Sequence, residues 1–395
     1  MLTTLIALAT LADVHSGCST LHGDTPNSYQ TGGQKSKEQE KLEKDIEDDK
    51  KIGKEASDYY DRALKPTKKA ESQQRVEDIG AKLALISNAN GFESTWGDKR
   101  RAEFEYKFKV VESKDINAFS LPGGYIYVYQ GLVDFTQSDD ELAGVLAHEI
   151  CHASQRHIAW MRREQEKMSV IQIPLILASI FSKGADGGAG ATAGQLLGTA
   201  MTNGWSVKAE TSADFGGVQL VIAGGYDATG MLTFMERLQA KEGVLTDSID
   251  LGIMRTHPPS KVRADRIEAY MNKNLIPVRR SLVSADFRVN NQVSATGSNV
   301  LFFGKRKLFT VGGSIDRATE TLTKLNLFFD RVPEMYDVTT GEDGVIYAKN
   351  RVLVTITPED AKANSMELEQ LQNAVAKSIR SSLFSLAYRI WEGRN

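Results

Sequence analysis

Two histidines four residues apart, with a glutamate beside the first, constrain this chain more than any other feature of its sequence. They lie in the segment His148-Glu149-Ile150-Cys151-His152. On a helix, positions i and i+4 share one face, so both imidazoles can turn a nitrogen toward a single cation. Glu149 is rotated by about 100° from His148, so its carboxylate reaches toward a bound water instead of replacing a ligand. The spacing therefore predicts a zinc-binding helix that carries a general base.

The residues around this motif predict the helix itself. Residues 138–141 (Ser-Asp-Asp-Glu) provide an N-cap and an acidic first turn. Apolar side chains then recur at helical spacing at Leu142, Val145, Leu146 and Ile150. With six histidines in 395 residues, the five-residue motif still arises by chance in about one such chain in a hundred. A third metal ligand is therefore needed to support the prediction.

The remaining histidines are poor candidates for this third ligand. His15 and His22 lie near the N-terminus, and His257 is far downstream. His157 follows His152 by five residues, so on the same helix it points well away from the metal. We therefore interpret His157 as a structural histidine and favour a carboxylate as the third ligand.

Two acidic residues downstream, Glu210 and Asp214, are one helical turn apart. One of them can bind the metal while the other accepts the remaining N–H of a ligand histidine, and Asp214 is well placed for the second role. Without the upstream motif, two solvated carboxylates on a surface helix would be the better interpretation.

Four ordered motifs make the chain similar to the HtpX and CAAX prenyl protease (Ste-type) family of zinc metallopeptidases, in the gluzincin clan. The motifs are residues 148–152, the pair Glu210 and Asp214, residues 117–128 (NAFSLPGGYIYV), and Thr256-His257-Pro258-Pro259 followed by Arg263. Together they cover roughly residues 60–275. The chain resembles in particular the soluble bacterial lipoprotein members of the periplasm.

The resemblance implies a site for one zinc ion per chain. His148, His152 and Glu210 would be its ligands. Glu149 would be the catalytic base, and Asp214 would hold a ligand histidine from behind.

The resemblance also implies residues that contact the substrate. Asn117 and Ala118 would bind the backbone of an extended polypeptide, and the alternative is a turn asparagine followed by a buried alanine. His257 and Arg263 would lie across the cleft and stabilise the oxyanion of the tetrahedral intermediate. His257 could instead be an ordinary residue at a helix N-terminus, or it could cap the metal in a resting state.

The N-terminus resembles an export signal. Residues 1–12 form an apolar run of the length of a signal peptide core, too short to span a bilayer. Gly17, Cys18 and Ser19 resemble a bacterial lipoprotein cleavage site. Cys18 is therefore predicted to carry lipid and to anchor the protein to the outer membrane, facing the periplasm. No Lys or Arg precedes the apolar run, which leaves an ordinary secretory signal or a cytoplasmic start as alternatives.

Length and composition predict the remaining organisation. A chain of 395 residues suggests two folded units, and a net charge of −3 gives no electrostatic footprint for nucleic acid. We expect a leader over residues 1–18, a polar tether over 19–54 that runs into a charged helix, a zinc metallopeptidase domain over 55–277 and a further domain over 278–395.

Within the metallopeptidase domain, residues 103–112 and 125–129 alternate as strands. Residues 171–181 are apolar but too short to cross a membrane, so they form either a packed helix or a mobile lid.

The sequence of the C-terminal part predicts two similar structural units. Residues 300–311 have the pattern of a hairpin and residues 315–331 that of a helix. Residues 344–356 repeat the hairpin pattern, and a second helix is predicted from about 366 to 391. These units form a small α+β domain that suggests an old duplication, and we expect it to bind a protein partner.

The predicted fold class is α+β, with a mainly helical zincin-like domain that carries a small sheet, followed by a small C-terminal α+β domain. The predicted function is zinc-dependent endopeptidase, and the resemblance implies misfolded or misassembled envelope proteins as polypeptide substrates. The alternative is a non-catalytic, metal-stabilised chaperone or scaffold lipoprotein. Glu149 argues against that alternative, because a purely structural zinc site has no use for a base.

Overall fold

The computed structural model describes residues 36–90, 92, 94–100, 102–166, 205–244 and 260–388. The described residues from 42 onward form one compact unit, and the described part of the preceding unit is the start of helix α1. None of the helices in these ranges is long and apolar enough to cross a membrane. The predicted lipid site at Cys18, the apolar segment 171–181 and the motif around His257 lie outside the described residues.

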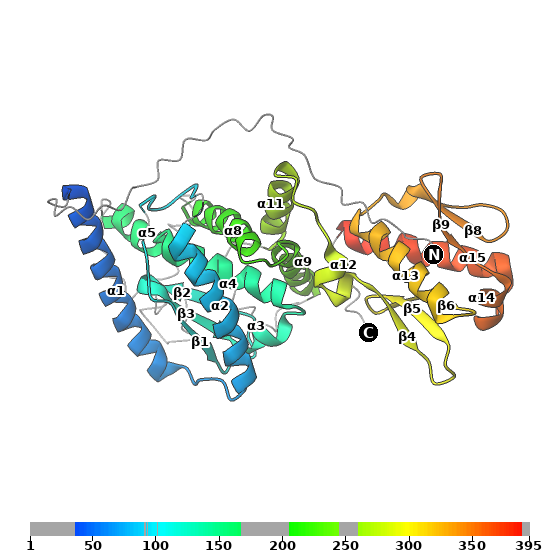
Figure 1. The fold of residues 1–395 in the computed structure, drawn as a ribbon, viewed down its shortest axis with the longest axis horizontal. Coiled ribbons are helices and arrows are strands. Elements are labelled where there is room, and N and C mark those ends of the chain that lie inside the picture. Colours follow the sequence, from blue (N-terminus) through cyan, green and yellow to red (C-terminus); the bar gives the residue numbers. More distant parts are fainter. Residues whose placement is uncertain are drawn as a thin grey trace, which may run out of the picture. The chain divides into compact units, whose positions relative to one another are not determined.

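A small mixed sheet lies beneath the predicted zinc helix and packs against it (Figure 1). Its strands are β1 (Lys107–Val111), β2 (Ala118–Leu121) and β3 (Tyr125–Tyr129), in the order β1-β3-β2. Strand β3 pairs parallel to β1 and antiparallel to β2. The prediction for residues 125–129 is confirmed. The other predicted strand is shorter than 103–112, because the side chain of Asn88 bonds the backbone of Phe104 and replaces a strand partner there.

The central strand β3 is buried on both faces, which divides the side chains between two cores. Ile126 and Val128 face the main core, whereas Tyr127 and Tyr129 face a smaller aromatic core on the opposite side. This alternation is the ordinary two-residue period of a strand.

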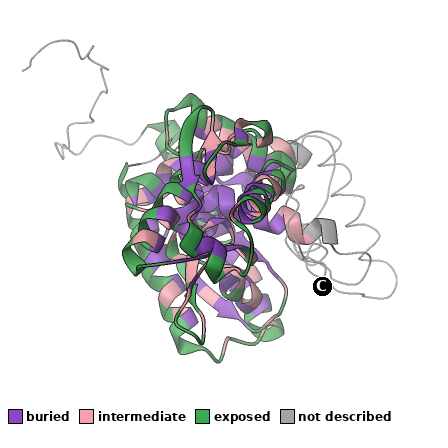
Figure 2. Ribbon diagram, turned by 90° about the vertical axis from the view of Figure 1, so that its right-hand side faces the viewer, coloured by how far each residue is buried: buried purple, intermediate pink, exposed green. Residues whose placement is uncertain are grey.

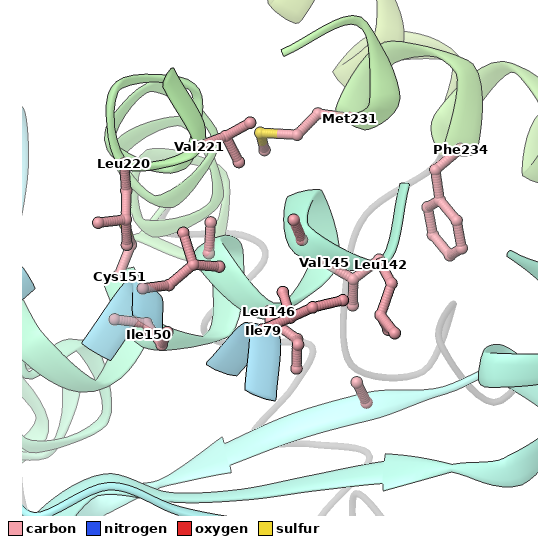
Figure 3. Packing of buried hydrophobic residues seen from close by; sticks show 14 of the residues in the cluster. Ile79, Leu142, Val145, Leu146, Ile150, Cys151, Leu220, Val221, Met231 and Phe234 are labelled. Atoms are coloured by element: carbon pink, nitrogen blue, oxygen red, sulfur yellow. The ribbon is translucent and has the colours of Figure 1, made fainter. Parts of the chain in front are cut away.

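Helix α4 (Asp139–Ser154) carries the zinc motif and is buried along most of its length. It packs against the sheet and against three helices. These are α2 (Ala70–Asn90), α8 (Trp205–Ala223) and α9 (Thr229–Val244). Figure 3 shows the apolar side chains that meet between them, among them Ile79, Leu146, Leu220, Met231 and Phe234. The predicted N-cap is confirmed, because the Ser138 side chain accepts a hydrogen bond from the Glu141 amide.

Helix α1 (Lys37–Ala63) corrects the predicted tether. The predicted boundary at residue 54 falls inside this helix, and residues 42–54 belong to the folded unit. Gly53, Ser57 and Tyr60 lie at helical spacing on the buried side. The Ser57 hydroxyl lies 2.9 Å from that of Tyr127, and Tyr60 packs on the same ring. The strongly polar composition of the helix concealed this narrow stripe of small and aromatic residues.

Helix α4 ends sooner than predicted, which changes the position of His157. Arg156 adopts a left-handed φ of 56°, and His157 begins a new helix, α5 (His157–Glu166). The expectation that His157 continues the zinc helix is therefore wrong. Its ring can reach back toward His152, because the chain turns between the two residues.

The C-terminal part contains two three-stranded antiparallel sheets with a separate hydrophobic core. In chain order the elements are α12 (Arg280–Val283), β4 (Val289–Val293), β5 (Asn299–Phe303), β6 (Arg306–Val311), α13 (Ile315–Asp330), β7 (Val338–Thr340), β8 (Val345–Ala348), β9 (Arg351–Thr355), α14 (Pro358–Ala363) and α15 (Leu368–Tyr388). Both predicted hairpins and both long helices are present, while α12, β4, β7 and α14 were not predicted.

The two C-terminal sheets also share a local irregularity. Each hairpin shifts register at the same place, between Leu301 and Phe302 in one and between Ile346 and Tyr347 in the other. This agreement supports the predicted duplication. The fold class is confirmed as α+β, with helices predominating around small sheets. Figure 2 shows that the buried residues lie where the helices and strands pack together and that the exposed residues lie on the outside.

Candidate metal centre

Three predicted ligands converge between helices α4 and α8. One donor atom each from His148, His152 and Glu210 lie within 4.8 Å of one another. The Nε2 atoms of the two histidines are 3.0 Å apart. The Glu210 carboxylate oxygens lie 3.4 Å from Nε2 of His148 and 3.3 Å from Nε2 of His152. Two imidazole nitrogens and one carboxylate are a donor set that zinc accepts while keeping a position open for a water or substrate. The residues present therefore fit this metal.

Close packing of α8 on α4 brings Glu210 to the histidines. Gly216 on α8 permits this approach. A Cβ at Gly216 would lie 3.0 Å from the sulfur of Cys151 on α4. This distance is shorter than an ordinary van der Waals contact, so a larger side chain would push the two helices apart.

The Nδ1 atom of His148, on the side away from the other ligands, lies 3.0 Å from a carboxylate oxygen of Asp214. This is the place predicted for Asp214. A carboxylate there accepts the Nδ1–H and leaves the Nε2 lone pair for the metal. Burial alone would raise the pKa of Asp214, but the charge of Arg263 and the hydrogen bond from His148 hold it below its ordinary value.

Arg263, on helix α11 (Ser260–Lys273), is almost fully buried behind the ligands. Its Nη2 donates to one oxygen of Asp214 at 2.6 Å, and its Nε donates to the other at 3.1 Å. Its Nη1 lies 3.4 Å from Glu210. The guanidinium therefore pairs with two carboxylates of the site, and its Nη2 also lies 3.1 Å from Nδ1 of His148. Its predicted contact with an oxyanion stays a prediction.

Glu149 lies one position beyond His148 on α4 and lines a narrow recess between α4 and α9. The other side chains around the recess are mainly apolar: Val145, Met231, Phe234 and Met235. A carboxylate at the edge of an apolar recess and beside the ligand histidines is where a base for an attacking water is needed.

Asn117 directly precedes β2 and Ala118 is its first residue; β2 is an outer strand of the sheet that packs against α4. Both residues are buried, and the Asn117 carbonyl accepts a hydrogen bond from the Tyr129 amide at 2.9 Å. The structure therefore places this segment beside the zinc helix, and its contact with substrate stays a prediction.

The contacts of two residues near the site, His157 and Arg156, were not predicted from the sequence. The Nδ1 atom of His157 lies 2.9 Å from the Nδ1 atom of His152, and its Nε2 donates to the Trp96 carbonyl at 3.1 Å. Arg156 is buried between the carboxylates of Asp49 and Asp98. These contacts could not be predicted from local sequence patterns, because they depend on where α4 ends and on segments far away in the chain.

Comparison with known protein families supports the interpretation of this site. The sequence profile of peptidase family M48 matches residues 71–271, which is just over half of the chain. The chain belongs to peptidase family M48. The matched region includes α4, α8 and α11, so all the residues of the metal centre described above lie within it. The prediction of a metalloendopeptidase is confirmed at the level of this family, and the finer assignment to the HtpX and CAAX type is not.

Individual relatives agree with the family. The chain is 31% identical over 170 residues to the mitochondrial metalloendopeptidase OMA1 of Schizosaccharomyces pombe, covering 43% of this chain and 48% of the relative. It is 30% identical over 188 residues to the beta-barrel assembly-enhancing protease of Escherichia coli (strain K12), covering 46% and 36%. The chain thus spans about half of these relatives or less.

One further relative matches a longer stretch of the chain, and a second family model matches its C-terminal part. The metalloprotease YcaL of Escherichia coli (strain K12) is 26% identical over 273 residues, which cover 67% of this chain and 94% of the relative. Residues 299–385 match a domain of unknown function, DUF8459.

The charges around His148 predict that zinc uptake depends on pH. Burial and Arg263 lower the pKa of His148, but its hydrogen bonds to Asp214 and Glu210 outweigh them and raise it to about 9. His148 is therefore protonated at neutral pH and must lose a proton to bind zinc. Between pH 6 and 8 we expect zinc affinity to rise by about tenfold for each pH unit. Chelator competition at several pH values measures this slope.

Asp214→Asn provides the control for this prediction, because it removes one of the groups that raise the pKa of His148. The slope should flatten in this variant. An affinity that does not change with pH in the unaltered protein would contradict the expected protonation of His148.

Proposed function

We propose that this protein is a zinc-dependent endopeptidase that hydrolyses peptide bonds with a metal-activated water. The observation that carries the proposal is the convergence of His148, His152 and Glu210 on one point, with Glu149 beside them on the same helix. Membership of peptidase family M48 supports it. A metal site that only stabilised a fold would not need a carboxylate base at that place.

The metal ligands and Glu149 have different roles in hydrolysis. His148, His152 and Glu210 would hold one zinc ion, which when bound supplies a Lewis acid that lowers the pKa of water and polarises the scissile carbonyl. Glu149 accepts the proton of the attacking water and delivers it to the leaving amine.

Two further groups support this chemistry. Asp214, itself held by Arg263, fixes the orientation of His148. His257 is proposed to stabilise the oxyanion, and that role rests on the resemblance of its motif.

The proposed substrates are extended or unfolded polypeptides. Strand β2 is an outer strand beside α4, so a substrate could lie along it near Asn117 and Ala118 with its main chain extended. A relative carries the name beta-barrel assembly-enhancing protease. On this basis we propose that the substrates include misfolded or misassembled envelope proteins.

We further propose that the protein works in the bacterial periplasm. The leader and Cys18 would provide a lipid anchor in the outer membrane, as in the lipoprotein members of the HtpX and CAAX type that the motifs resemble. The domain over residues 278–395 is proposed to bind a protein partner. Palmitate labelling of the unaltered protein and of Cys18→Ala tests the anchor.

Removal and return of the metal test the proposed activity. Zinc chelation should abolish cleavage of an unfolded polypeptide, and one equivalent of zinc should restore it, because zinc supplies the Lewis acid that the reaction needs. The measurement is the rate of appearance of new amino termini. Suppression of aggregation without any cleavage, with and without zinc, would favour the chaperone or scaffold alternative.

A further inference from the structure

We infer that His157 is a positioning residue of the metal centre, which fixes the tautomer and the orientation of the ligand His152. This inference rests on the proposed function only in that it takes His152 to be a zinc ligand. It assigns to His157 a role that the sequence pattern did not suggest.

The two nitrogens of His152 face different partners. Its Nε2 lies 3.0 Å from the Nε2 of His148 and 3.3 Å from Glu210, on the side where the ligands converge. Its Nδ1 lies 2.9 Å from the Nδ1 of His157. A neutral imidazole that offers Nε2 to a metal carries its proton on Nδ1. His152 must therefore donate this N–H, and His157 must accept it.

The carbonyl of Trp96 determines that Nδ1 of His157 accepts this hydrogen bond. Its Nε2 lies 3.1 Å from the carbonyl oxygen of Trp96. A carbonyl oxygen can only accept a hydrogen bond, so Nε2 of His157 carries the proton and its Nδ1 presents a lone pair. The order of donation thus runs from His152 to His157 and from His157 to Trp96. Only this order leaves the Nε2 lone pair of His152 available to a metal.

The surroundings hold His157 in one orientation. The side chain is fully buried, and its ring packs on that of Trp96 with centroids 5.4 Å apart. A Cβ at Gly97, where φ is 105°, would lie 2.8 Å from the ring, so a larger residue there would displace it. The preceding residue, Arg156, is fixed by ion pairs to Asp49 and Asp98.

The two ligand histidines therefore have different partners behind them. His148 donates to the carboxylate of Asp214, whereas His152 donates to a second imidazole. Groups that hold metal ligands from behind typically contribute 10–100-fold to metal affinity or activity. His157 is expected to contribute in the same way, by holding the ring of His152 at the angle that the metal requires.

A pair of amide variants separates the acceptor role from simple packing. In His157→Asn, the side-chain oxygen lies near the position of Nδ1 and can accept the N–H of His152. In His157→Gln, the longer amide reaches the position of Nε2 and can donate to the Trp96 carbonyl, but no acceptor remains at Nδ1. His157→Leu removes both contacts.

The test measures zinc affinity by chelator competition, together with thermal unfolding of each metal-free protein. We expect zinc affinity to fall by about 10–100-fold in His157→Gln and His157→Leu, and His157→Asn to stay within a few-fold of the unaltered protein. If His157→Leu fails to fold, the difference between the Asn and Gln variants decides.

Two results would overturn the inference. One is equal zinc affinity in all folded variants, and the other is an affinity that follows metal-free stability, with Gln better than Asn. In both cases the unaltered protein binds zinc, so the proposed function survives. Absence of zinc binding in the unaltered protein would overturn the proposed function together with the inference.

Discussion

Glu149→Gln is expected to lower peptide cleavage by about 10²–10⁴-fold while the protein keeps its zinc, since a positioned general base contributes this much to a rate. Glutamine has the shape of glutamate but cannot accept the proton of an attacking water. His148, His152 and Glu210 are unchanged in this variant, so the ligand set remains complete. The measurement is the cleavage rate of an unfolded polypeptide per bound zinc.

A second buried glutamate on the same helix gives the matched control. Glu141 lies near the start of α4, where its carboxylate pairs with Arg237 at 2.7 Å. Glu141→Gln should change thermal stability but leave the cleavage rate of the folded, zinc-loaded protein unchanged. Full cleavage by Glu149→Gln at normal zinc content would remove Glu149 from the mechanism.

Glu210→Gln is expected to weaken zinc binding by more than about 100-fold, beyond the range typical for groups that act only behind a ligand. The neutral amide replaces an anionic donor, and Arg263 would then lie beside the metal with less compensating negative charge. Competition with a chelator of known affinity measures the loss, with zinc content after dialysis as a second measure.

Asp214→Asn is the variant with which the loss of zinc affinity in Glu210→Gln is compared. Asp214 contacts His148 from behind, so its loss should weaken zinc binding by about 10–100-fold. Glu210→Gln must therefore be the more damaging of the two changes. The reverse order would mean that the ligand and the supporting carboxylate have been exchanged in our assignment.

The parts of the site that local patterns determine were predictable from the sequence. Ser138 and the apolar stripe of α4 predict a helix, and the helix alone brings His148 and His152 to one face. The alternating residues of β3 likewise predict a strand. In each case the deciding interactions lie within a few residues along the chain.

The contacts that depend on distant segments could not be predicted. Helix α1 docks through Gly53, Ser57 and Tyr60, and its many charged residues hide this stripe. His157 reaches His152 only because Arg156 turns the chain, and Asp49 and Asp98, from distant segments, stabilise that turn. Arg263 was placed by family resemblance, which gave its neighbourhood but not the direction of its guanidinium.

The number and kind of atoms around bound zinc test the central claim most directly. Zinc analysis and X-ray absorption of the purified full-length protein report the metal content and its nearest atoms. We expect one zinc per chain, with nitrogen and oxygen neighbours only, and loss of a nitrogen neighbour in His152→Ala. A protein that purifies without zinc and does not take it up, or one whose zinc has a sulfur neighbour, would contradict the site formed by His148, His152 and Glu210.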